Sequence, residues 1–576
     1  MTKLTGGDIL VECLLKENVT KVFGIPGDQL YPILDAIYRK NDIDFVLTRH
    51  EQAAAHAADA WARVTGDPGV CLATVGPGAA DLVPGVYPAF VESIPMIVIC
   101  AQNQTFRIDP THGSSQELDQ QALFAPITKW RVCISHWKRI SMLTQWAYRV
   151  ATSGRPGPVL IDMPSDILYE IGDPSELESP ILPPPRYRAV NPPRGDLNAI
   201  QKAAQWLVQA EFPLIHAGGG VLTSEASNVL VKLAEHLSAP VTTSFRARGV
   251  VPEDHKLCLI AGSFGAMAAQ ADADVVLFVG GKFGDLDLWG QPPIWGEPEE
   301  QKLIQIDIDP TMIGLNRPVD LAIVGDARTT LKILYEEIKK LHPEKIPVSE
   351  KLAECRKAQE DWLRDFLEAG KSNAVPIHPL RLIKDVREFF PRNALCVIDG
   401  GNTTVWATYL NRIYEPRTYL ATGTDSGHLG TITGYMLGAK LAAPDRLVYG
   451  IAGDGAFMFN IQELETLRRL NLPVIIVVAN DRAYGMIKAG QKTIYGSRFI
   501  GVDFFDVRYD KIAQGFDCYG ERVTEPEEIK LALGRAVDSG KPAVLDVFID
   551  AAINLEPPDF ETLAGIWLEG CQLPSE

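Results

Sequence analysis

The chain has 576 residues, of which 46% are hydrophobic and 22% are charged, close to the average for folded soluble proteins. This composition excludes a disordered chain, a collagen-like chain and a small disulfide scaffold, and the length predicts three or four domains. With 55 basic and 73 acidic residues the net charge is −18, which argues against a nucleic-acid partner bound through overall charge.

Residues 1–185 alternate helical and strand patterns and form the first predicted domain. A capping box at Thr5–Asp8 begins the first helix, and the strand KVFG then enters a Gly/Pro turn. Helix 29–40, strand FVLTR, helix 53–63 and strand GVCLATV follow, and a turn is expected at Gly76–Gly78. PMIVICA and GPVLIDMP are two further buried strands. Continuous apolar strands separated by helices indicate a parallel sheet covered on both faces.

A proline-rich linker, 180–195, precedes a second α/β domain over 196–340, whose strands are FPLIHAGGG, APVTTS, ADVVLFVGG and KLIQIDIDP. The charged stretch 345–372 predicts a solvent-exposed helical connector. A third α/β domain spans 375–555, with strands ALCVIDGGN, RLVYGIAGDG, LPVIIVVAND and PAVLDVFID, and the tail 556–576 is expected to cover a surface or a site. The predicted fold class is therefore α/β, with three doubly wound parallel-sheet domains.

Membrane and export signals are not apparent in the sequence. No apolar run approaches the roughly 18–20 residues of a membrane-spanning helix, and the N-terminus lacks a basic region followed by an apolar stretch. The nine cysteines are odd in number, widely spaced and without a CxxC pair. Reduced thiols in apolar cores are the favoured interpretation, which predicts a cytoplasmic protein without a membrane partner.

Four strand-end turns are candidate binding sites, because open α/β sheets bind ligands beyond the carboxyl ends of their strands. They are GIPGDQ, RHEQ, TVGPG and GDGAF. The last is the strongest, because Asp454 lies between two glycines and the next strand ends at Asp481. Two carboxylates at neighbouring strand ends suit Mg²⁺, and the glycines allow the backbone to approach a diphosphate closely.

This unit resembles the diphosphate motif of thiamine-diphosphate enzymes, and the resemblance extends over roughly residues 1–555. RHEQAAAHAADAWARVTG, GPGAADLVPGVYPAFVESIPMIVI and RPGPVLIDMPSD are similar to the pyrimidine-binding domain of the acetolactate synthase and pyruvate oxidase branch. QIDIDPTMIG and VGDA are similar to its central domain. The resemblance implies a pyrimidine-binding, a nucleotide-binding-like central and a diphosphate-binding domain.

Glu51 matches the glutamate that contacts the aminopyrimidine ring in this family. A carboxyl at a buried strand end can share a proton with a ring nitrogen and so promote loss of the thiazolium C2 proton. The activated cofactor then attacks a 2-oxo acid and acts as the electron sink. The alternative for Glu51 is a carboxylate that only stabilises a helix N-terminus.

The resemblance also assigns cofactor contacts. Asp454, Asp481 and the main-chain carbonyl of Ala483 match the metal ligands, although the family often has Asn at the second position. Gly430 and Ile432 match the segment that cradles the aminopyrimidine; Ile432 would wedge between the two rings, a role compatible with ordinary core packing. The other expected contacts are Gly453, Gly455, Ala456, Tyr484, Gly485 and Met486.

The central domain matches FAD-contacting segments of the acetolactate synthase branch. Strand-end glycines and a carboxylate for a ribose suit any nucleotide site. FAD, an ADP-like group and an empty vestigial site all remain open here. The matching positions are Gly218, Gly219, Gly281, Asp307, Ile308 and Asp326.

Four positions on the substrate side depart from acetolactate synthases. Leu286 and Gly490 stand where the family has the Arg and Trp that recognise the second 2-oxo acid, and Ser165 replaces a Lys. Ser115 replaces a Phe, although Gln116 is retained as a catalytic candidate. Loss of a guanidinium and an indole removes a carboxylate clamp and a stacking wall, which puts the usual acceptor in doubt.

Other side chains are candidates for the substrate side. Asp28 is either a proton donor to the reaction intermediate or the N-cap of the helix that follows. His112 is either a proton shuttle or an exposed loop histidine. Tyr484, Lys488 and His428 are further candidates to face the substrate.

The expected activity is decarboxylation of a pyruvate-like 2-oxo acid followed by acetolactate-synthase-like carboligation. A pyruvate oxidase or simple decarboxylase is the alternative, and intact Glu51, Asp454 and Asp481 argue against a non-catalytic cofactor binder. Because the family builds its site from two chains, the resemblance implies a homodimer or homotetramer; a regulatory subunit stays open.

Overall fold

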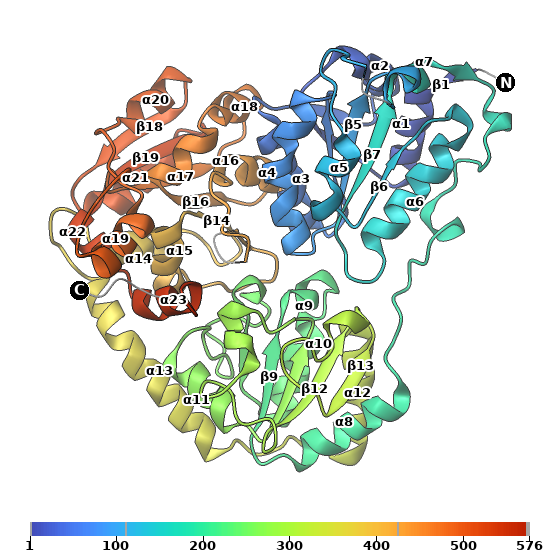
Figure 1. Ribbon diagram of the computed structural model, residues 1–576. Helices are drawn as coiled ribbons and strands as arrows, with labels where there is room; N and C mark the ends of the chain where they lie inside the picture. Colours follow the sequence, from blue (N-terminus) through green and yellow to red (C-terminus); the bar gives the residue numbers. More distant parts are fainter. Residues whose placement is uncertain (1–2, 110–111, 423–424, 572–576) are drawn as a thin grey trace. The chain divides into compact units, whose positions relative to one another are not determined.

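The computed structural model describes residues 3–109, 112–422 and 425–571. Three large parallel sheets, each with helices packed beside it, lie within the three predicted domain ranges and confirm the α/β fold class (Figure 1). By proximity the residues group into two compact units, each described here by itself. The first unit comprises Met1–Asn191, His428–Asp445 and Phe457–Val474, and the second comprises the rest. The domain boundaries therefore stay a prediction.

The first compact unit contains a six-stranded sheet in the order β3-β2-β4-β5-β7-β6, in which neighbouring strands run parallel. Its strands are β2 (Lys21–Gly24), β3 (Asp44–Leu47), β4 (Gly69–Ala73), β5 (Met96–Gln102), β6 (Trp130–Cys133) and β7 (Pro158–Pro164); β1 (Leu4–Thr5) and β8 (Ile171–Gly172) form a short antiparallel pair. The helices are α1 (Gly6–Lys16), α2 (Tyr31–Lys40), α3 (Glu51–Thr65), α4 (Pro77–Val91), α5 (Gln120–Leu123), α6 (Ile140–Thr152), α7 (Ser165–Tyr169), α16 (Ile432–Ala442) and α18 (Glu463–Arg469).

Side chains alternate between the two faces along the strands of this sheet, and an apolar face packs against the helices. Val70 and Leu72 of β4 belong to the cluster formed with α1, α2 and α6. On β4, Gly69 lies so close to α3 that a Cβ there would stand 1.9 Å from the Ala58 carbonyl oxygen. Only glycine permits this backbone approach of β4 to α3.

The central sheet has five parallel strands in the order β10-β9-β11-β12-β13. Its elements are β9 (Pro213–Ala217), β10 (Val241–Thr243), β11 (Val275–Val279), β12 (Lys302–Asp307), β13 (Leu321–Val324), α8 (Leu197–Gln209), α9 (Gly219–Thr223), α10 (Ser227–Leu237), α11 (Phe264–Asp272) and α12 (Ala327–Leu341). One continuous apolar cluster joins the strands to these helices. The connector helix α13 (Glu350–Ala369) is largely exposed, as expected for a solvent-exposed connector, and one side of it buries Leu352, Cys355 and Trp362.

The third sheet has six parallel strands in the order β15-β14-β16-β17-β19-β18. Its strands are β14 (Leu395–Asp399), β15 (Tyr419–Ala421), β16 (Val448–Gly453), β17 (Ile475–Asn480), β18 (Tyr519–Val523) and β19 (Ala543–Phe548). The accompanying helices are α14 (Pro379–Phe389), α15 (Gly401–Leu410), α17 (Asp454–Phe457), α19 (Gly485–Tyr495), α20 (Tyr509–Gly515), α21 (Glu528–Asp538), α22 (Ala551–Asn554) and α23 (Phe560–Trp567). One face of the sheet packs against α14, α15 and α21.

All three sheets share the strand order 2-1-3-4 over their first four strands. Numbered from its own first strand, the central sheet reads 2-1-3-4-5, and the other two read 2-1-3-4-6-5. The chain therefore reverses direction between the first and third strand of each sheet, and such a reversal opens a crevice beyond the strand ends. Gly218 shows how close the two strand ends come, because a Cβ there would stand 2.2 Å from the Gly280 carbonyl oxygen.

The structure tests several local predictions. Thr5 and Asp8 form the predicted capping box. After Asp454, a 3₁₀ turn ends at Asn460 and α18 begins at Glu463. All nine cysteines are free, but Cys571 is exposed rather than in a core. Among the described residues, no helix has both the length and the apolar character needed to cross a bilayer.

Candidate active site

Glu51 is the first residue of α3, directly beyond the end of β3 in the first compact unit. His50 is the N-cap, and its Nδ1 accepts a hydrogen bond from the Gln52 amide at 3.1 Å. The Glu51 side chain is only 8% exposed. Burial raises the pKa of the Glu51 carboxyl, and the negative charge of Asp81 adds to this, against the lowering effects of a main-chain N–H and of His50. A carboxyl with a raised pKa exchanges a proton more readily near neutral pH.

The TVGPG turn faces Glu51. A Cβ on Gly78 would stand 3.0 Å from Glu51 Oε1, and a Cβ on Gly76 would stand 2.2 Å from the Gln116 carbonyl oxygen. Gly76 has φ +70° and Gln116 has φ +61°, so both segments turn sharply where they meet. Thr74 is also part of this cluster, because a Cβ on Gly78 would touch its methyl group. The structure thus brings Gln116 and Glu51 to one turn.

Gln29 joins the same cluster, although the sequence did not single it out. Thr74 Oγ1 donates to Gln29 Oε1 at 2.7 Å, and Gln29 Nε2 donates to Gln116 Oε1 at 3.4 Å. Its position in the GIPGDQ turn, one of the four predicted turns, was the only signal that could have identified it.

The segment around Gly430 lies beside α3 within the same unit. Gly430 has φ +81°, and its carbonyl accepts a hydrogen bond from Asn460 Nδ2 at 2.7 Å. Ile432 is 1% exposed at the start of α16. Gln52 Nε2 and His428 Nε2 are 3.2 Å apart, which ties the segment to the residue after Glu51. Burial lowers the pKa of His428, so its imidazole is neutral at pH 7.

Asp28 and His112 are exposed, and neither is placed beside Glu51 by a recorded contact of its side chain. Asp28 does not cap the following helix: Gly27 occupies the N-cap of the 3₁₀ turn, without a side-chain cap, and Leu30 precedes α2. The N-cap alternative for Asp28 was therefore wrong. The main-chain N–H of His112 donates to Glu117 Oε1 at 3.0 Å in an exposed loop. Their roles in proton transfer stay predictions.

Asp454 and Asp481 lie at the ends of neighbouring strands in the second compact unit, because β16 pairs directly with β17. The side chains are 1% and 7% exposed. Asp454 Oδ1 accepts from the Gly455 amide and Oδ2 from the Arg482 amide, each at 2.8 Å. Burial and the facing Asp481 carboxyl raise the pKa of Asp454 to about 8.

Burial also raises the pKa of Asp481, opposed by a hydrogen bond from Asn554. Two buried carboxyls with raised pKa values, one of them raised partly by the charge of the other, form a set that a divalent cation stabilises in the ionised state. The donor set therefore fits Mg²⁺. The amide of Asn402 lies beside Asp481 at Gly485, and its buried Oδ1 has no hydrogen-bonding partner among the described residues.

Helix N-termini surround this pair. Helices α15, α17 and α19 begin directly after β14, β16 and β17, three strands adjacent in the sheet. Main-chain N–H groups at helix starts bind phosphate oxygens. Two glycines keep the space open: a Cβ on Gly455 would stand 2.7 Å from the Tyr484 ring, and one on Gly401 would stand 2.7 Å from Met486 Cβ. The arrangement suits a diphosphate beside a divalent cation.

The turn that carries Ala483 is held by a second segment. Ala483 forms an antiparallel bridge with Asp503, and the Tyr484 amide donates to the Val502 carbonyl at 2.9 Å. The rings of Tyr484 and Phe504 pack edge to face, with centroids 4.6 Å apart. Ala483 therefore has its main chain fixed by residues 502–504, rather than by its own strand.

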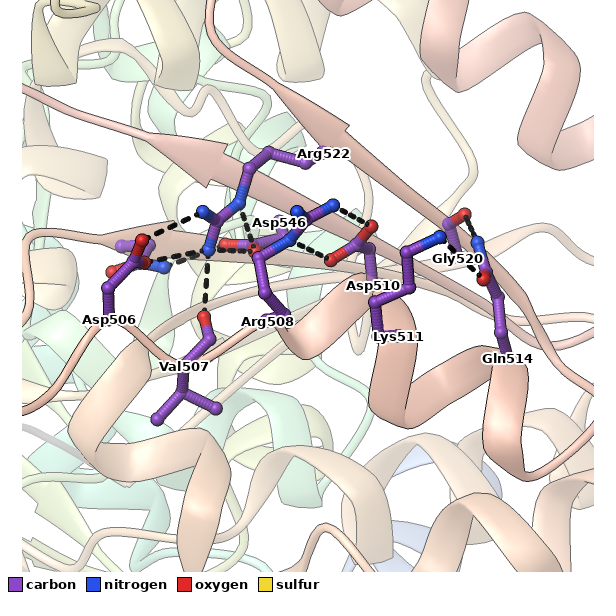
Figure 2. Close-up of polar contacts among 10 residues, drawn as sticks. Asp506, Val507, Arg508, Asp510, Lys511, Gln514, Gly520, Arg522 and Asp546 are labelled. Carbon is purple, nitrogen blue, oxygen red and sulfur yellow. Dashed lines mark hydrogen bonds and ion pairs between the residues drawn. The ribbon is translucent and has the colours of Figure 1, made fainter.

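That second segment is anchored to the sheet by a buried ion pair. Figure 2 shows Arg522 of β18 between Asp546 of β19, Asp506 and the Val507 carbonyl. The distances are 2.8 Å from Arg522 Nε to Asp546 Oδ2 and 2.9 Å from Nη2 to Asp506 Oδ1. Asp546 Oδ1 in turn accepts from Asn480 Nδ2 at 2.8 Å. A continuous polar path thus connects the residue before Asp481 to the segment that holds Ala483.

Asn554 contacts Asp481 directly and was missed by the sequence analysis. Its Nδ2 donates to Asp481 Oδ2 at 2.6 Å. Trp406 Nε1 donates to Asn554 Oδ1 at 2.7 Å, and Asn402 Nδ2 donates to the Asn554 carbonyl at 2.6 Å. The tail segment that begins just after it, described up to Cys571, packs Phe560 and Ala564 of α23 against Ala489 of α19.

The predicted nucleotide positions gather at the carboxyl edge of the central sheet. Gly218 and Gly219 follow β9, and Gly281 follows β11. Asp307 ends β12 and its Oδ1 accepts from the Asp309 amide at 2.8 Å, with the half-buried Ile308 between them. Asp326 caps α12, with Oδ1 accepting from the Thr329 amide at 2.9 Å. The two carboxyls therefore already shape local turns, and nucleotide contact stays a prediction.

The positions that depart from the resemblance are spread over several elements. Ser165 is buried at the start of α7, and Leu286 is half-buried in a 3₁₀ segment. Gly490 lies in α19, where a Cβ would stand 3.7 Å from the Phe560 ring. Lys488, which is one of the candidates to face the substrate, pairs with Asp503, and its Nζ lies 2.5 Å from Oδ1. Ser115 is exposed.

Comparisons with known proteins agree with this geometry. Models of three domains of thiamine pyrophosphate enzymes match the chain: the N-terminal TPP binding domain at residues 4–123, the central domain at 200–334 and the C-terminal TPP binding domain at 399–547. The chain is 36% identical to a probable acetolactate synthase large subunit of Methanocaldococcus jannaschii, over 96% of this chain and 94% of that protein.

Two bacterial relatives show the same extent of similarity. The acetolactate synthase large subunit of Corynebacterium glutamicum is 32% identical over 96% of this chain and 88% of its own. The large subunit of acetolactate synthase isozyme 3 of Escherichia coli is 31% identical over 97% of each chain.

Proposed function

Because this chain belongs to the thiamine pyrophosphate enzyme family, alongside acetolactate synthase large subunits, we propose that it decarboxylates pyruvate and joins the two-carbon unit to a second 2-oxo acid. The family supplies the enzyme class, a thiamine-diphosphate-dependent enzyme of acetolactate synthase type. The donor and acceptor are inferred from the names of the relatives, which span nearly the same length.

The observation that carries the proposal is the environment of Glu51. When bound, thiamine diphosphate supplies a carbanion equivalent and an electron sink for decarboxylation. Glu51 would hold a proton against the aminopyrimidine ring, since its carboxyl is buried and has a raised pKa. Gly430 and the buried Ile432 would support that ring, and Gln116 and Gln29 would bind polar groups of the substrate from the TVGPG turn.

Asp454, Asp481 and the Ala483 carbonyl would bind Mg²⁺. Gly453 at the end of β16 and the starts of α17 and α19 would bind the diphosphate oxygens, the helices through Gly455, Ala456, Gly485 and Met486. The strand pairing that sets Asp454 beside Asp481 supports this, as do the raised pKa values of both carboxyls, that of Asp454 raised in part by Asp481.

Three further assignments belong to the proposal. A homodimer or homotetramer would supply Glu51 and Asp454 to one cofactor from two chains. FAD would occupy the carboxyl edge of the central sheet, where glycines permit close backbone approach. A cytoplasmic location is consistent with nine free cysteines, which a reducing compartment preserves.

A second candidate is favoured by one specific feature. Leu286 and Gly490 offer neither a guanidinium nor an indole to a second 2-oxo acid. Pyruvate oxidase or simple decarboxylase chemistry, which uses an oxidant or a proton as acceptor, requires no such clamp.

Products formed from pyruvate separate these activities. Purified protein is supplied with Mg²⁺, thiamine diphosphate and pyruvate under air, and its products are identified by mass spectrometry. Acetolactate supports the proposal, acetate with peroxide indicates an oxidase, and acetaldehyde indicates a decarboxylase. If the protein neither retains nor takes up thiamine diphosphate, the proposed function is wrong.

A further inference from the structure

Asn554 lies at the end of α22, 5% exposed, and its side chain is fully engaged between two partners. We propose that Asn554 is a positioning residue that restricts Asp481 to binding the metal through one carboxylate oxygen, and thereby selects Mg²⁺ over Ca²⁺. This inference rests on the proposed binding of Mg²⁺ by Asp454 and Asp481.

The orientation of the Asn554 amide follows from its neighbours. The indole Nε1–H of Trp406 is a donor only, so the atom it faces at 2.7 Å must be the amide oxygen of Asn554. The amide nitrogen consequently faces Asp481 Oδ2, at 2.6 Å. Asp481 Oδ2 therefore receives a side-chain donor of fixed orientation, in addition to the main-chain N–H groups of Ala483 and Asp481 that hydrogen-bond to the same carboxyl.

Hydrogen bonds also fix the main chain of Asn554. Asn402 Nδ2 donates to its carbonyl at 2.6 Å, and its own amide donates to the Asp550 carbonyl at 2.9 Å. The Asp550 amide donates to the Ile377 carbonyl at 2.8 Å. A Cβ on Gly485 would stand 2.8 Å from Asn554 Nδ2 and 3.0 Å from Asp481 Oδ2, so the contact is closely packed. Neither partner can rotate away without disturbing α15 or α19.

One-oxygen binding matters because the two cations differ in coordination. Mg²⁺ requires near-ideal octahedral geometry with short bonds, whereas Ca²⁺ accepts six to eight oxygens and often binds a carboxylate through both. A hydrogen bond that occupies Oδ2 opposes two-oxygen binding. Removal of that bond frees Oδ2 and lets Asp481 rotate, which weakens the Mg²⁺ geometry but suits Ca²⁺.

The test uses the full-length chain stripped of metal with EDTA and saturated with thiamine diphosphate, titrated calorimetrically with MgCl₂ or CaCl₂. For Asn554→Ala we expect the Mg²⁺ dissociation constant to rise about 10- to 100-fold. The Ca²⁺ constant should change far less, so the preference for Mg²⁺ falls. Trp406→Phe, which keeps the Asn554 side chain but removes the donor that orients it, should shift the preference in the same direction by a smaller factor.

The controls separate positioning from folding. Asn373→Ala removes an amide that accepts from Arg381 Nη1 at 2.6 Å, and we expect both constants to be unchanged. If Asn554→Ala does not fold, Trp406→Phe alone decides. Equal weakening of both cations, or no change in either, overturns the inference, because a loosened structure does not discriminate between ions. If the unaltered protein binds thiamine diphosphate with neither cation, the proposed function fails, and this inference with it.

Discussion

Buried carboxyls occur at strand ends in both compact units, but their surroundings differ. Glu51 stands beside a glycine turn with one weak anionic neighbour, Asp81. Asp454 and Asp481 face one another, and each accepts hydrogen bonds from fixed donors. Burial raises the pKa in both places, to about 8 for Asp454. A buried carboxyl whose acidic neighbour is exposed, as Asp81 is, suits proton exchange, whereas a buried facing pair suits a cation.

The largest effect is expected for Glu51→Gln. An amide cannot exchange a proton with the aminopyrimidine ring, so pyruvate turnover should fall about 10²- to 10⁴-fold. Exchange of the cofactor C2 proton for deuterium, followed by NMR, should lose its acceleration, while thiamine diphosphate still binds.

The matched control is Glu176→Gln, an exposed carboxylate paired with Lys138, for which turnover should be unchanged. Wild-type turnover in the Glu51 variant would show that the proton role belongs elsewhere.

Asp481→Ala should have the second largest effect. Unlike Glu51→Gln, it should weaken the binding of thiamine diphosphate. With one carboxylate left, retention of thiamine diphosphate through gel filtration should fall about 10- to 100-fold and recover partly with added Mg²⁺. Chelation of Mg²⁺ from the unaltered protein should mimic this loss. Asp365→Ala, on the exposed face of α13, is the control. If Asp481→Ala retains thiamine diphosphate but loses turnover, Asp481 does not serve cofactor binding, and the proposed difference in role between Asp481 and Glu51 is wrong.

Replacement of Arg522 tests the support behind the metal turn (Figure 2). Arg522→Met leaves the fully buried Asp546 without its cation, and such a loss costs about 3 kcal/mol. The urea midpoint should fall accordingly, with a smaller loss of Mg²⁺ affinity. Arg535→Met removes an exposed pair with Glu521 and should cost less than about 1 kcal/mol. Equal midpoints for both variants would contradict the anchoring role.

The smallest effect concerns a buried carboxyl outside both sites. Asp162 is 1% exposed, and burial raises its pKa to about 7, opposed by hydrogen bonds from Gln121, Gln102 and Gln120. The folded chain therefore binds this proton more tightly than the unfolded chain, whose aspartates titrate near pH 4. Its contribution to stability is present below pH 4 and is lost as the pH rises towards and through 7.

We therefore expect the thermal midpoint to fall between about pH 5 and pH 8, and Asp162→Asn to flatten part of that fall. At pH 8 the variant should gain about 2–4 °C, since its amide has no charge to bury. Scanning calorimetry over this range measures both. A variant with an unchanged pH profile would show that Asp162 ionises in the folded state as it does when exposed.

The strands that the sequence predicted and those it missed differ in position. The interior strands β4, β5, β16 and β17 were identifiable because they are buried on both faces and read as continuous apolar runs. β6, β13, β15 and β18 were missed, and all four are edge strands. β18, with the sequence YGERV, includes two charged side chains that pair with neighbours, so its pattern resembles a loop.

The residues of the candidate site also divide into those that the sequence identified and those that it missed. Glu51, Asp454 and Asp481 were identifiable because each follows an apolar strand within a glycine-containing or polar turn of characteristic spacing. Asn554 carried no such signal. It follows Asp481 by more than seventy positions, and only the pairing of β17 with β19 brings the residues after β19 to the metal turn.

The sequence by itself determined the α/β class, the interior strands and the identity of the buried carboxyls, because burial and turn geometry leave local patterns in the chain. Tertiary structure alone decided which side chains gather near those carboxyls: Gln29 and Gln116 beside the TVGPG turn that faces Glu51, and Asn554 at Asp481. Strand order decides which of these side chains come into contact. It depends on contacts between segments that are distant in the sequence, and local sequence patterns do not specify such contacts.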